Sequence, residues 1–479
     1  MRNSEFTVAM SNVADELLQR FLLRSDGQED LTLCLWTPSR GLGRLTALLH
    51  TPVLPEKDER QVHGNVSFNT RYMERAVQLA MEQKCGLALL HSHPGPGWQS
   101  MSYDDKVAES KWAGLVEATT ELPFVGMTLG TDGVWSARFW QHVKKRKFAE
   151  QWCRNVRSAG ESLRVHFADQ VAPPPTFREM FKRTVVVWGK ENHAKLARLR
   201  IGIVGLGSVG SLVTEILARM GMQCFVLIDF DEIQTHNLDR LVTATAKDLG
   251  RLKVDVTEER MRQSSTAASI EIAKVPYSVV EEHGYRAALD CDVIFSCVDR
   301  PRARKILNHI AYAHLIPVVD GGIAVRFRNQ EFNGVDWQLQ TVGPSRPCLE
   351  CIGQFTSDDA STEEAGFLDD PSYLQNLPDE HGFKRNENVF LFSANLASLE
   401  VMQMVELCTG IGGIHDYGIQ RFRSNIGTLE YDVEKECNPN CGMEALIAQG
   451  DRSFHLYGRD RAAESARLRQ SYNMRKAKT

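Results

Sequence analysis

The sequence lacks several features that mark particular classes of protein. Its 11 cysteines are few and scattered for 479 residues, which excludes a small disulfide scaffold and favours reduced thiols. The formal net charge is only −5, so bulk electrostatics provide no basic field for nucleic acid. No apolar run reaches membrane-spanning length, and the N-terminus lacks the basic start and apolar middle of a signal peptide. We therefore expect a cytoplasmic protein with neither nucleic acid nor membrane as a partner.

The apolar content is sufficient for large cores, since 43% of the residues are hydrophobic and the length suggests two or three domains. Residues 1–150 mix helical and strand patterns and carry a TDG turn between apolar stretches at 131–133, which predicts a compact α/β domain with a hairpin. The three prolines of VAPPPTF at 171–177 favour a linker over residues 151–180.

From residue 181 to about residue 445 the pattern changes. Short β-rich apolar runs alternate with helical patterns, as where LRIGIVGLG precedes SLVTEILARMG. This alternation predicts a mostly parallel, Rossmann-like sheet with helices on both faces, so the whole chain is expected to be α/β. Residues 446–479 are basic and polar, and we expect a solvated helix and tail there.

A pair of histidines ends the apolar run GLALLH at 86–91. Residues two apart in a strand face one side, so His91 and His93 can converge, and Asp105 can return to the same point from the next helix. Two imidazoles and a carboxylate leave a fourth tetrahedral position open, as a catalytic zinc requires to activate a water. Taken alone, such histidines are more often loop or core residues, and Ser102 with Asp105 would be an ordinary capping box.

The complete string is His91-Ser-His93-Pro, seven residues, Ser102, two residues and Asp105. It resembles the JAMM signature of the MPN/JAB metallopeptidases, and the resemblance covers roughly residues 12–145. It implies that His91, His93 and Asp105 are zinc ligands and that Ser102 hydrogen-bonds the tetrahedral intermediate.

The general base in that family is a glutamate near the start of an earlier strand. GQEDLTLCLW places Glu29 just before such a strand, and Glu29 is our candidate for accepting the proton of the attacking water. Glu56 and Glu59 lie in the charged stretch PEKDERQ, which we expect to be a solvated loop, so they rank behind Glu29.

A glycine-rich motif lies a hundred residues further on. Gly205, Gly207 and Gly210 separate a strand pattern from a helical one, and Asp229 and Asp231 close the next strand pattern. Glycines let phosphates approach the backbone, a helix N-terminus favours negative charge, and an acidic residue about twenty positions on can bind ribose hydroxyls. The motif alone suits an NAD-dependent dehydrogenase equally well.

The polar residues that follow favour a triphosphate, because attack on ATP requires positive charge and magnesium, whereas hydride transfer does not. Asn237, Arg240 and Lys253 follow the acidic strand end, and Asp299 follows a later strand. Each alone would usually be a surface residue. Together with the glycines they resemble the ThiF/MoeB adenylating fold shared with ubiquitin-activating enzymes, over about residues 181–445.

That resemblance implies a role for each residue. Asp229 and Asp231 would lie at the ribose and metal side of ATP, and Asp299 would coordinate magnesium. In the family an arginine before the first strand reaches into the neighbouring subunit's site, and Arg183 is the candidate, so a homodimer is expected. The residues implied to hold the phosphates are Asn237, Arg240 and Lys253.

Four cysteines form two pairs: Cys348, Cys351, Cys437 and Cys441. Four thiolates suit a closed structural zinc, and the pairs resemble the family's zinc knuckle. Many members carry a catalytic cysteine after the first pair, but residues 352–407 contain none. Cys291, Cys297 and Cys408 lie in apolar stretches and are expected in the core. The chain therefore either stops at the acyl-adenylate or passes the acyl group to another protein or to an unexpected residue.

Both resemblances point to one substrate class, a small protein with a flexible C-terminus. We expect an enzyme that adenylates a ubiquitin-like protein and cleaves its precursors or conjugates, as in bacterial ubiquitin-like conjugation systems, with a separate conjugating enzyme as a possible partner. The alternative is processing and activation of a sulfur-carrier protein for cofactor or sulfur-metabolite biosynthesis. A non-catalytic scaffold that binds such a tail and a dehydrogenase are less favoured.

Overall fold

The structure is a computed structural model that describes residues 5–63, 65–144, 147–328, 331–376, 388–410, 413 and 416–476. The chain divides into two compact units. Unit 1 comprises Met1–Pro174, Ala313–Leu315 and Ala445–Phe454. Unit 2 comprises Pro175–Tyr312, Ile316–Glu444 and His455–Thr479. Every helix in the described ranges is too short or too polar to cross a membrane.

Unit 1 is built on a nine-stranded sheet with the order β11-β10-β1-β3-β2-β6-β7-β8-β9. Its strands are β1 (Glu5–Ser11), β2 (Leu31–Arg40), β3 (Arg44–Val53), β6 (Gly86–Ser92), β7 (Val125–Leu129), β8 (Trp135–Lys144), β9 (Lys147–Trp152), β10 (Asn155–Ala159) and β11 (Leu163–Phe167). A separate hairpin joins β4 (Arg60–His63) and β5 (Asn65–Phe68). The helices are α1 (Asn12–Leu22), α2 (Thr70–Glu82) and α3 (Tyr103–Thr120).

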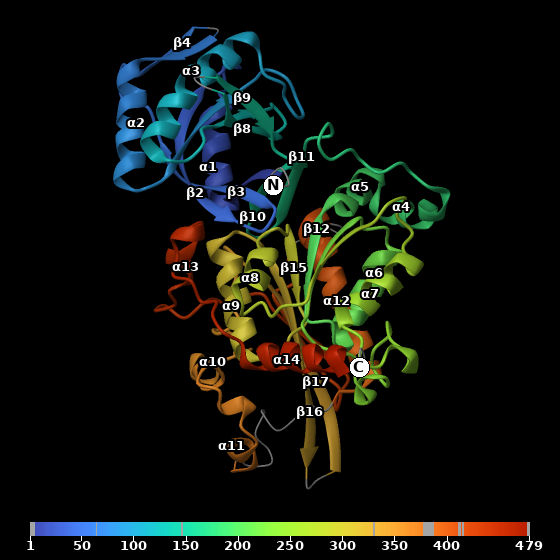
Figure 1. The fold of residues 1–479 in the computed structure, drawn as a ribbon. Coiled ribbons are helices and arrows are strands. Elements are labelled where there is room, and N and C mark those ends of the chain that lie inside the picture. The colour runs from blue at the N-terminus through green and yellow to red at the C-terminus, as the bar shows by residue number, and fades with distance from the viewer. Residues whose placement is uncertain are drawn as a thin grey trace. The chain divides into compact units, whose positions relative to one another are not determined.

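The two faces of this sheet follow from the period-two alternation of its strands. In β2, Leu33 and Leu35 belong to the core under α2 and α3, whereas Cys34 and Trp36 belong to the core under α1. Figure 1 shows α1 on one side of the sheet and α2 and α3 on the other. The predicted hairpin is confirmed, because β7 and β8 pair in antiparallel fashion around residues 131–133.

The structure differs from the prediction at both ends of unit 1. The stretch 151–180, predicted as a linker, contains β10 and β11, and all of Asn155–Ala159 is buried. Polar residues such as Arg157 fill that strand, so hydropathy gives no strand signal, and the unit instead ends within the prolines at Pro174. The predicted tail begins with residues that belong to unit 1, where the Thr37 hydroxyl donates to the Ala448 carbonyl.

Unit 2 contains an eight-stranded sheet with the order β14-β13-β12-β15-β16-β17-β18-β19. Neighbours from β14 to β16 are parallel and those from β16 to β19 are antiparallel. The strands are β12 (Arg200–Val204), β13 (Cys224–Ile228), β14 (Glu271–Val275), β15 (Val293–Ser296), β16 (Val318–Arg328), β17 (Glu331–Val342), β18 (Ile419–Arg423) and β19 (Thr428–Asp432).

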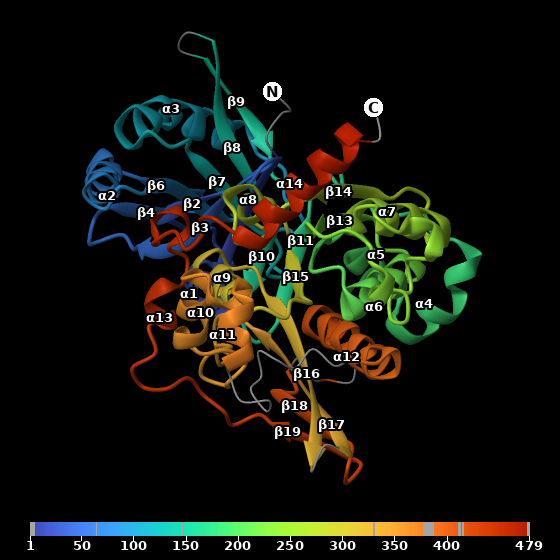
Figure 2. The ribbon, with the colours of Figure 1, turned by 60° about the horizontal axis from the view of Figure 1, so that its bottom comes forward.

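Helices cover both faces of the parallel part, as predicted, with α6, α7 and α12 on one face and α8 and α9 on the other (Figures 1 and 2). The α-helices after unit 1's sheet are α4 (Lys182–Trp188), α5 (Lys190–Arg198), α6 (Ser208–Arg219), α7 (Lys253–Ser264), α8 (Glu282–Ala288), α9 (Pro301–Ala313), α10 (Ser357–Glu364), α11 (Pro371–Asn376), α12 (Phe390–Thr409), α13 (Met443–Leu446) and α14 (Arg461–Lys476). Short 3₁₀ helices are η1 (Glu179–Phe181), η2 (Thr235–Asn237), η3 (Ala246–Asp248), η4 (Phe367–Asp369) and η7 (Gly450–Arg452).

The strand order of unit 2 indicates where a ligand would bind. The chain runs outward from β12 to β13 and β14 and then crosses to β15 on the other side of β12. Ligands of open α/β sheets bind outside the carboxyl ends of the strands at such a switch point. Gly205 follows β12, Asp229 follows β13 and Asp299 lies three residues after β15, so all three lie at this edge.

Candidate metal centres and nucleotide site

The histidine segment forms a compact cluster of metal-ligand atoms in unit 1. His91 is the penultimate residue of β6, and the Nε2 atoms of His91 and His93 lie 3.1 Å apart. Asp105 Oδ1 is 3.4 Å from His91 Nε2, and Oδ2 is 3.3 Å from His93 Nε2. Three electron-pair donors thus face one point, and this set fits the three protein ligands of a catalytic zinc.

A capping box holds Asp105 in place. Ser102 is the N-cap of α3, its hydroxyl accepts from the Asp105 amide at 3.1 Å, and its own amide donates to Asp105 Oδ2 at 2.8 Å. The helix-capping role of Ser102 and Asp105 is therefore compatible with a role for Asp105 as a metal ligand. Burial raises the pKa of Asp105, but the hydrogen bonds from His91 and His93 lower it by more, so the carboxyl stays ionised.

Buried polar residues outside the histidine motif form a hydrogen-bonded chain that ends at His91. Arg138 and Glu109 form a buried ion pair, with Nε to Oε2 at 3.0 Å, and the Trp140 indole donates to Glu109 at 2.7 Å. Arg138 also donates to the Thr128 hydroxyl at 2.7 Å, which lies 3.5 Å from His91 Nε2. The sequence signal for these residues is the charged Arg138 within the apolar stretch SARFW, and the prediction from sequence did not include it.

The three glutamates considered as a general base differ in their surroundings. Glu29 precedes β2 and is half-buried, and its charge contributes to raising the pKa of His93, after the larger effect of the hydrogen bond to Asp105. Glu56 is exposed. Glu59 was expected to be solvated, which is wrong, because it is 1% exposed and its carboxylate binds the Arg75 guanidinium at 2.6 Å. Glu59 is buried and already paired with Arg75, so Glu29 stays the candidate base.

The glycine motif of unit 2 forms a tight turn between β12 and α6. Gly205 has φ +89°, a left-handed conformation that favours glycine, and a Cβ there would lie 2.4 Å from the Cys297 carbonyl oxygen. A Cβ at Gly210 would lie 2.0 Å from the Gly205 oxygen. Gly207 is the N-cap of α6 and has open space around its missing Cβ. The loops after β12 and β15 thus meet, and the α6 N-terminus opens beside them.

Acidic residues and one lysine connect this turn to β13. Asp229 accepts from the Leu206 amide at 2.6 Å and from the Asp231 amide at 2.7 Å, so its carboxylate shapes the glycine loop. Lys253 begins α7, and its Nζ lies 2.7 Å from Asp231 and 3.9 Å from Asp229. Burial lowers the pKa of Lys253, but the two carboxylates raise it by more, so a buried ammonium remains charged beside the loop.

Asn237 and Arg240, which were predicted to hold the phosphates, both lie between β13 and α7. The Asn237 side chain caps η2 by accepting from the Gln234 amide at 3.0 Å. Arg240 binds Asp239 at 2.9 Å, and its carbonyl accepts from the Ser208 hydroxyl at 3.4 Å, next to the start of α6.

Asp299 and Arg183 are both exposed. Burial lowers the pKa of Lys253, and the carboxylates of Asp229 and Asp231 raise it. The Asp299 carboxylate adds a smaller contribution in the same direction, which connects it electrostatically to the glycine turn. Arg183 lies on α4, and among the described residues no hydrogen bond or ion pair joins it to the glycine turn.

The segment after Asp299 is held by ion pairs. Arg300 lies 3.0 Å from Asp369, and the Arg302 amide donates to Glu363 at 2.8 Å. Burial raises the pKa of Glu363 to about 7. A titratable contact therefore supports the chain segment that presents the predicted magnesium ligand.

The four paired cysteines converge in unit 2, with their sulfur atoms within 4.8 Å of one another. Cys348 Sγ lies 3.7 Å from Cys441 Sγ. Two backbone amides donate to the sulfurs, from Cys348 to Cys437 at 3.2 Å and from Asn438 to Cys351 at 3.3 Å. This donor set fits a closed tetrahedral zinc.

The other cysteines predicted for the core are inaccessible or unreactive. Cys291 is fully buried, and burial raises the pKa of Cys297 well above its usual range and that of Cys408 to about 12. A thiol with so high a pKa is a poor nucleophile at neutral pH. These thiols therefore do not replace the cysteine that residues 352–407 lack.

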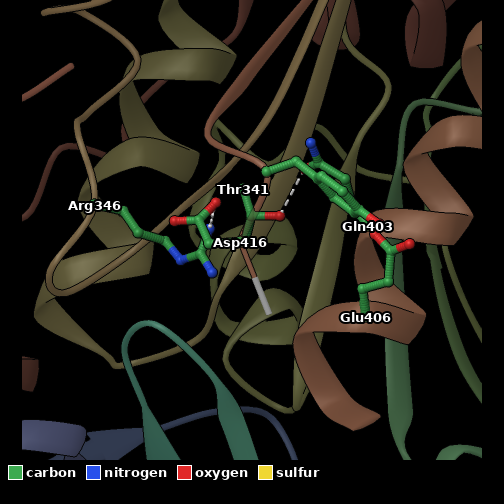
Figure 3. Close-up of a pocket in the computed structure, with 6 residues that line it drawn as sticks. Thr341, Arg346, Gln403, Glu406 and Asp416 are labelled. Carbon is green, nitrogen blue, oxygen red and sulfur yellow. Dashed lines mark hydrogen bonds and ion pairs between the residues drawn. The ribbon is translucent and has the colours of Figure 1, made fainter. Parts of the chain in front are cut away.

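A small polar hollow between β17 and α12 is a further feature of unit 2 (Figure 3). Its lining groups bind one another, with Arg346 to Asp416 at 2.7 Å and the Thr341 hydroxyl donating to Gln403 at 2.9 Å. These side chains thus already bind one another, and we assign no ligand to the hollow.

Comparison with known proteins agrees with the geometry of unit 2. The model of the ThiF family matches residues 181–441, which is more than half of the chain. The chain belongs to the ThiF family. The strand order, glycine turn and polar residues described above all lie within this ThiF segment, and residues 1–180 lie outside it.

Curated relatives align over parts of this chain. Escherichia coli molybdopterin-synthase adenylyltransferase is 30% identical over 193 residues, 39% of this chain and 73% of that protein. Saccharomyces cerevisiae tRNA threonylcarbamoyladenosine dehydratase 2 is 28% identical over 218 residues, 44% of this chain and 46% of that protein. The Haloferax volcanii SAMP-activating enzyme E1 is 27% identical over 164 residues, 34% of this chain and 57% of that protein. The chain thus spans about half the length of the yeast relative.

Among solved structures, E. coli MccB with MccA-N7isoASN has 16% identity and a TM-score of 0.42, covering 56% of this chain and 75% of that chain. The assignment of a Rossmann-like ThiF fold rests on the family match and on the strand order of unit 2.

Proposed function

We propose that unit 2 adenylates the C-terminus of a ubiquitin-like protein with ATP and that unit 1 is a JAMM-type zinc peptidase acting on precursors or conjugates of the same protein. The observation that carries the first half is the convergence of the glycine turn with Lys253 and Asp231 at the switch point of a ThiF-family sheet. Relatives named as a molybdopterin-synthase adenylyltransferase and a SAMP-activating enzyme support it.

The adenylation step is an in-line displacement. A carboxylate oxygen of the modifier attacks the α-phosphorus, an O–P bond forms, and the bond from the α-phosphorus to the bridging oxygen breaks as pyrophosphate leaves with the electron pair. Asn237, Arg240 and Lys253 hold the phosphates, and positioning with cation stabilisation supplies most of the acceleration. Asp299 would hold magnesium, which neutralises phosphate charge when bound.

The peptidase step is hydrolysis of the bond after the modifier's C-terminus. His91, His93 and Asp105 would hold zinc, which supplies Lewis acidity when bound. Glu29 takes a proton from the attacking water and returns one to the leaving amine, and Ser102 hydrogen-bonds the tetrahedral oxygen. Breakage of the C–N bond leaves a carboxylate, the group that unit 2 then activates. The convergence of the three ligand atoms within 4.8 Å supports this half.

The acyl acceptor lies outside this chain in our proposal. Residues 352–407 carry no cysteine, and Cys408 has a thiol pKa of about 12, so the acyl-adenylate is passed to another protein, such as a separate conjugating enzyme. The lack of a cysteine in residues 352–407 also favours a second candidate function, the activation of a sulfur-carrier protein. In that case the adenylated C-terminus of the carrier accepts sulfur and releases AMP. We further propose a homodimer in which Arg183 of α4 reaches the partner's nucleotide.

Two variants separate the activities. Purified chain is mixed with candidate ubiquitin-like or sulfur-carrier proteins, ATP and magnesium, and modifier-dependent pyrophosphate exchange is measured beside cleavage of a C-terminally extended modifier. Asp299→Ala should abolish exchange and spare cleavage, and His93→Ala should do the reverse. Loss of both activities in both variants, with the fold intact, would contradict two separable sites. The nature of the acceptor that consumes the adenylate distinguishes the two candidate substrates.

A further inference from the structure

The C-terminal helix α14 is docked on unit 2, although its basic, polar sequence predicts a solvated end. Arg467 donates to Glu281 at 2.8 Å and contacts its second oxygen, and the same guanidinium lies 5.0 Å from the Tyr277 ring centroid. Ala463 and Ala466 are 0% and 7% exposed. Small residues on one face and an ion pair thus fix the helix against the segment between β14 and α8.

The same helix also reaches the acidic end of β13. The Gln470 side-chain amide donates to the Phe230 carbonyl at 3.4 Å. Burial raises the pKa of Glu232, and the nearby Arg469 guanidinium opposes that effect. Phe230 and Glu232 flank Asp231, which binds Lys253 beside the glycine turn. One helix therefore spans the segments that follow two neighbouring parallel strands, β13 and β14 (Figure 2).

Those two segments border the place of a bound nucleoside. In open α/β sheets a nucleotide lies along the carboxyl ends, with its phosphates at the glycine turn and its ribose beside the acidic end of the next strand. The base then extends past that strand towards the one beyond it, which here is β14. The segment from Tyr277 to Glu281 follows β14, and α14 packs on it.

We propose that α14 forms the outer wall of the adenosine subsite, with Gln470 and Arg469 as positioning and specificity residues for a purine nucleoside triphosphate. The amide of Gln470 is at the strand end where a ribose hydroxyl would lie, and it can exchange its long bond to Phe230 for one to the ribose. Arg469 is exposed and forms no ion pair with another described residue, so its charge is available to the nucleotide. This role rests on the proposed function of unit 2 in ATP-dependent adenylation.

The test measures ATP binding and exchange with the full chain. A double variant, Arg469→Ala with Gln470→Ala, should raise the dissociation constant for ATP by about tenfold, since it removes one or two polar contacts to the ligand. The KM for ATP in pyrophosphate exchange should rise in parallel, and the KM for the modifier should not change. Arg461→Ala is the matched control, since it removes an arginine from the first turn of the same helix, eight residues from Arg469.

The outcomes distinguish this role from the proposed function. Wild-type chain that fails to bind ATP would contradict the proposed function itself. Wild-type chain that binds ATP, with a double variant that binds it equally well or more tightly, would overturn only the role of α14. Tighter binding by the double variant would instead mark α14 as an obstacle to the nucleotide. Circular dichroism of the variant checks that α14 remains helical.

Discussion

The buried ion pair behind the histidine cluster gives a prediction whose size follows from the structure. Glu109 and Arg138 have side chains that are 1% and 0% exposed. Glu109 accepts from Arg138 and from Trp140, so Glu109→Gln removes the charge that compensates Arg138 and turns an amide towards donors. Removing one partner of a buried pair costs about 3–5 kcal/mol, because the other charge stays desolvated.

The matched control is a similar pair at the surface of the same unit. Glu150 binds Lys106, and the two side chains are 23% and 54% exposed. Water screens such a pair, so Glu150→Gln should cost less than about 1 kcal/mol. Both variants make the same chemical change, from a carboxylate to an amide, in residues that pair with a cation.

The assay is calorimetric unfolding of the full chain, in which the transition of unit 2 serves as an internal reference. For a unit of this size, 1 kcal/mol corresponds to roughly 2–4 °C, so Glu109→Gln should lower the Tm of unit 1 by about 10 °C. It should also weaken zinc retention, because Arg138 holds Thr128 beside His91. A Tm within about 2 °C of that of Glu150→Gln would refute the reasoning.

Three further predictions concern metal content, the glycine turn and pH. The wild-type chain should contain two zinc ions by elemental analysis and His93→Ala one, so a single zinc in wild type would contradict the histidine site. Gly210→Ala should unfold at a markedly lower temperature, since its Cβ would lie 2.0 Å from a backbone oxygen, whereas Gly207→Ala, with nothing within 4 Å, should not. Burial raises the pKa of Glu363 from 4.5 to about 7, so the folded state keeps a proton that the unfolded state loses, and the free energy of unfolding should fall by roughly 3 kcal/mol or less as pH rises through that window. Glu363→Gln should flatten that dependence in urea titrations, and an unchanged slope would contradict it.

The residues predicted best from the sequence are those whose spacing along the chain is short. His91, His93 and Asp105 meet because the two histidines lie at and just after the end of β6, and Asp105 lies in the first turn of the following helix. The glycine turn and its acidic strand end follow equally from a strand, a turn and a helix in succession. In such segments the local secondary structure alone brings the residues together, so their positions can be predicted without knowing contacts to distant parts of the chain.

The features that the sequence did not predict depend on contacts between distant segments. Glu59 is charged and lies in a polar stretch, yet Arg75 of α2 buries it. Strand β10 contains polar residues that hydropathy cannot distinguish from a loop. The basic C-terminal residues pack because Glu281 and Tyr277 are placed by β14 and α8, which no pattern within residues 446–479 reveals. For Glu59 and Arg467, a partner on another helix or loop satisfies the charge.

The most direct test of the account uses one modifier in two forms, a precursor with a C-terminal extension and the trimmed protein. Wild-type chain should give pyrophosphate exchange with both forms, after a lag with the precursor, because cleavage in unit 1 releases the carboxylate that unit 2 activates. His93→Ala should give exchange with the trimmed form alone. Equal exchange by His93→Ala with both forms, or none by wild type with the trimmed form, would contradict the claim that the two sites act in sequence on one C-terminus.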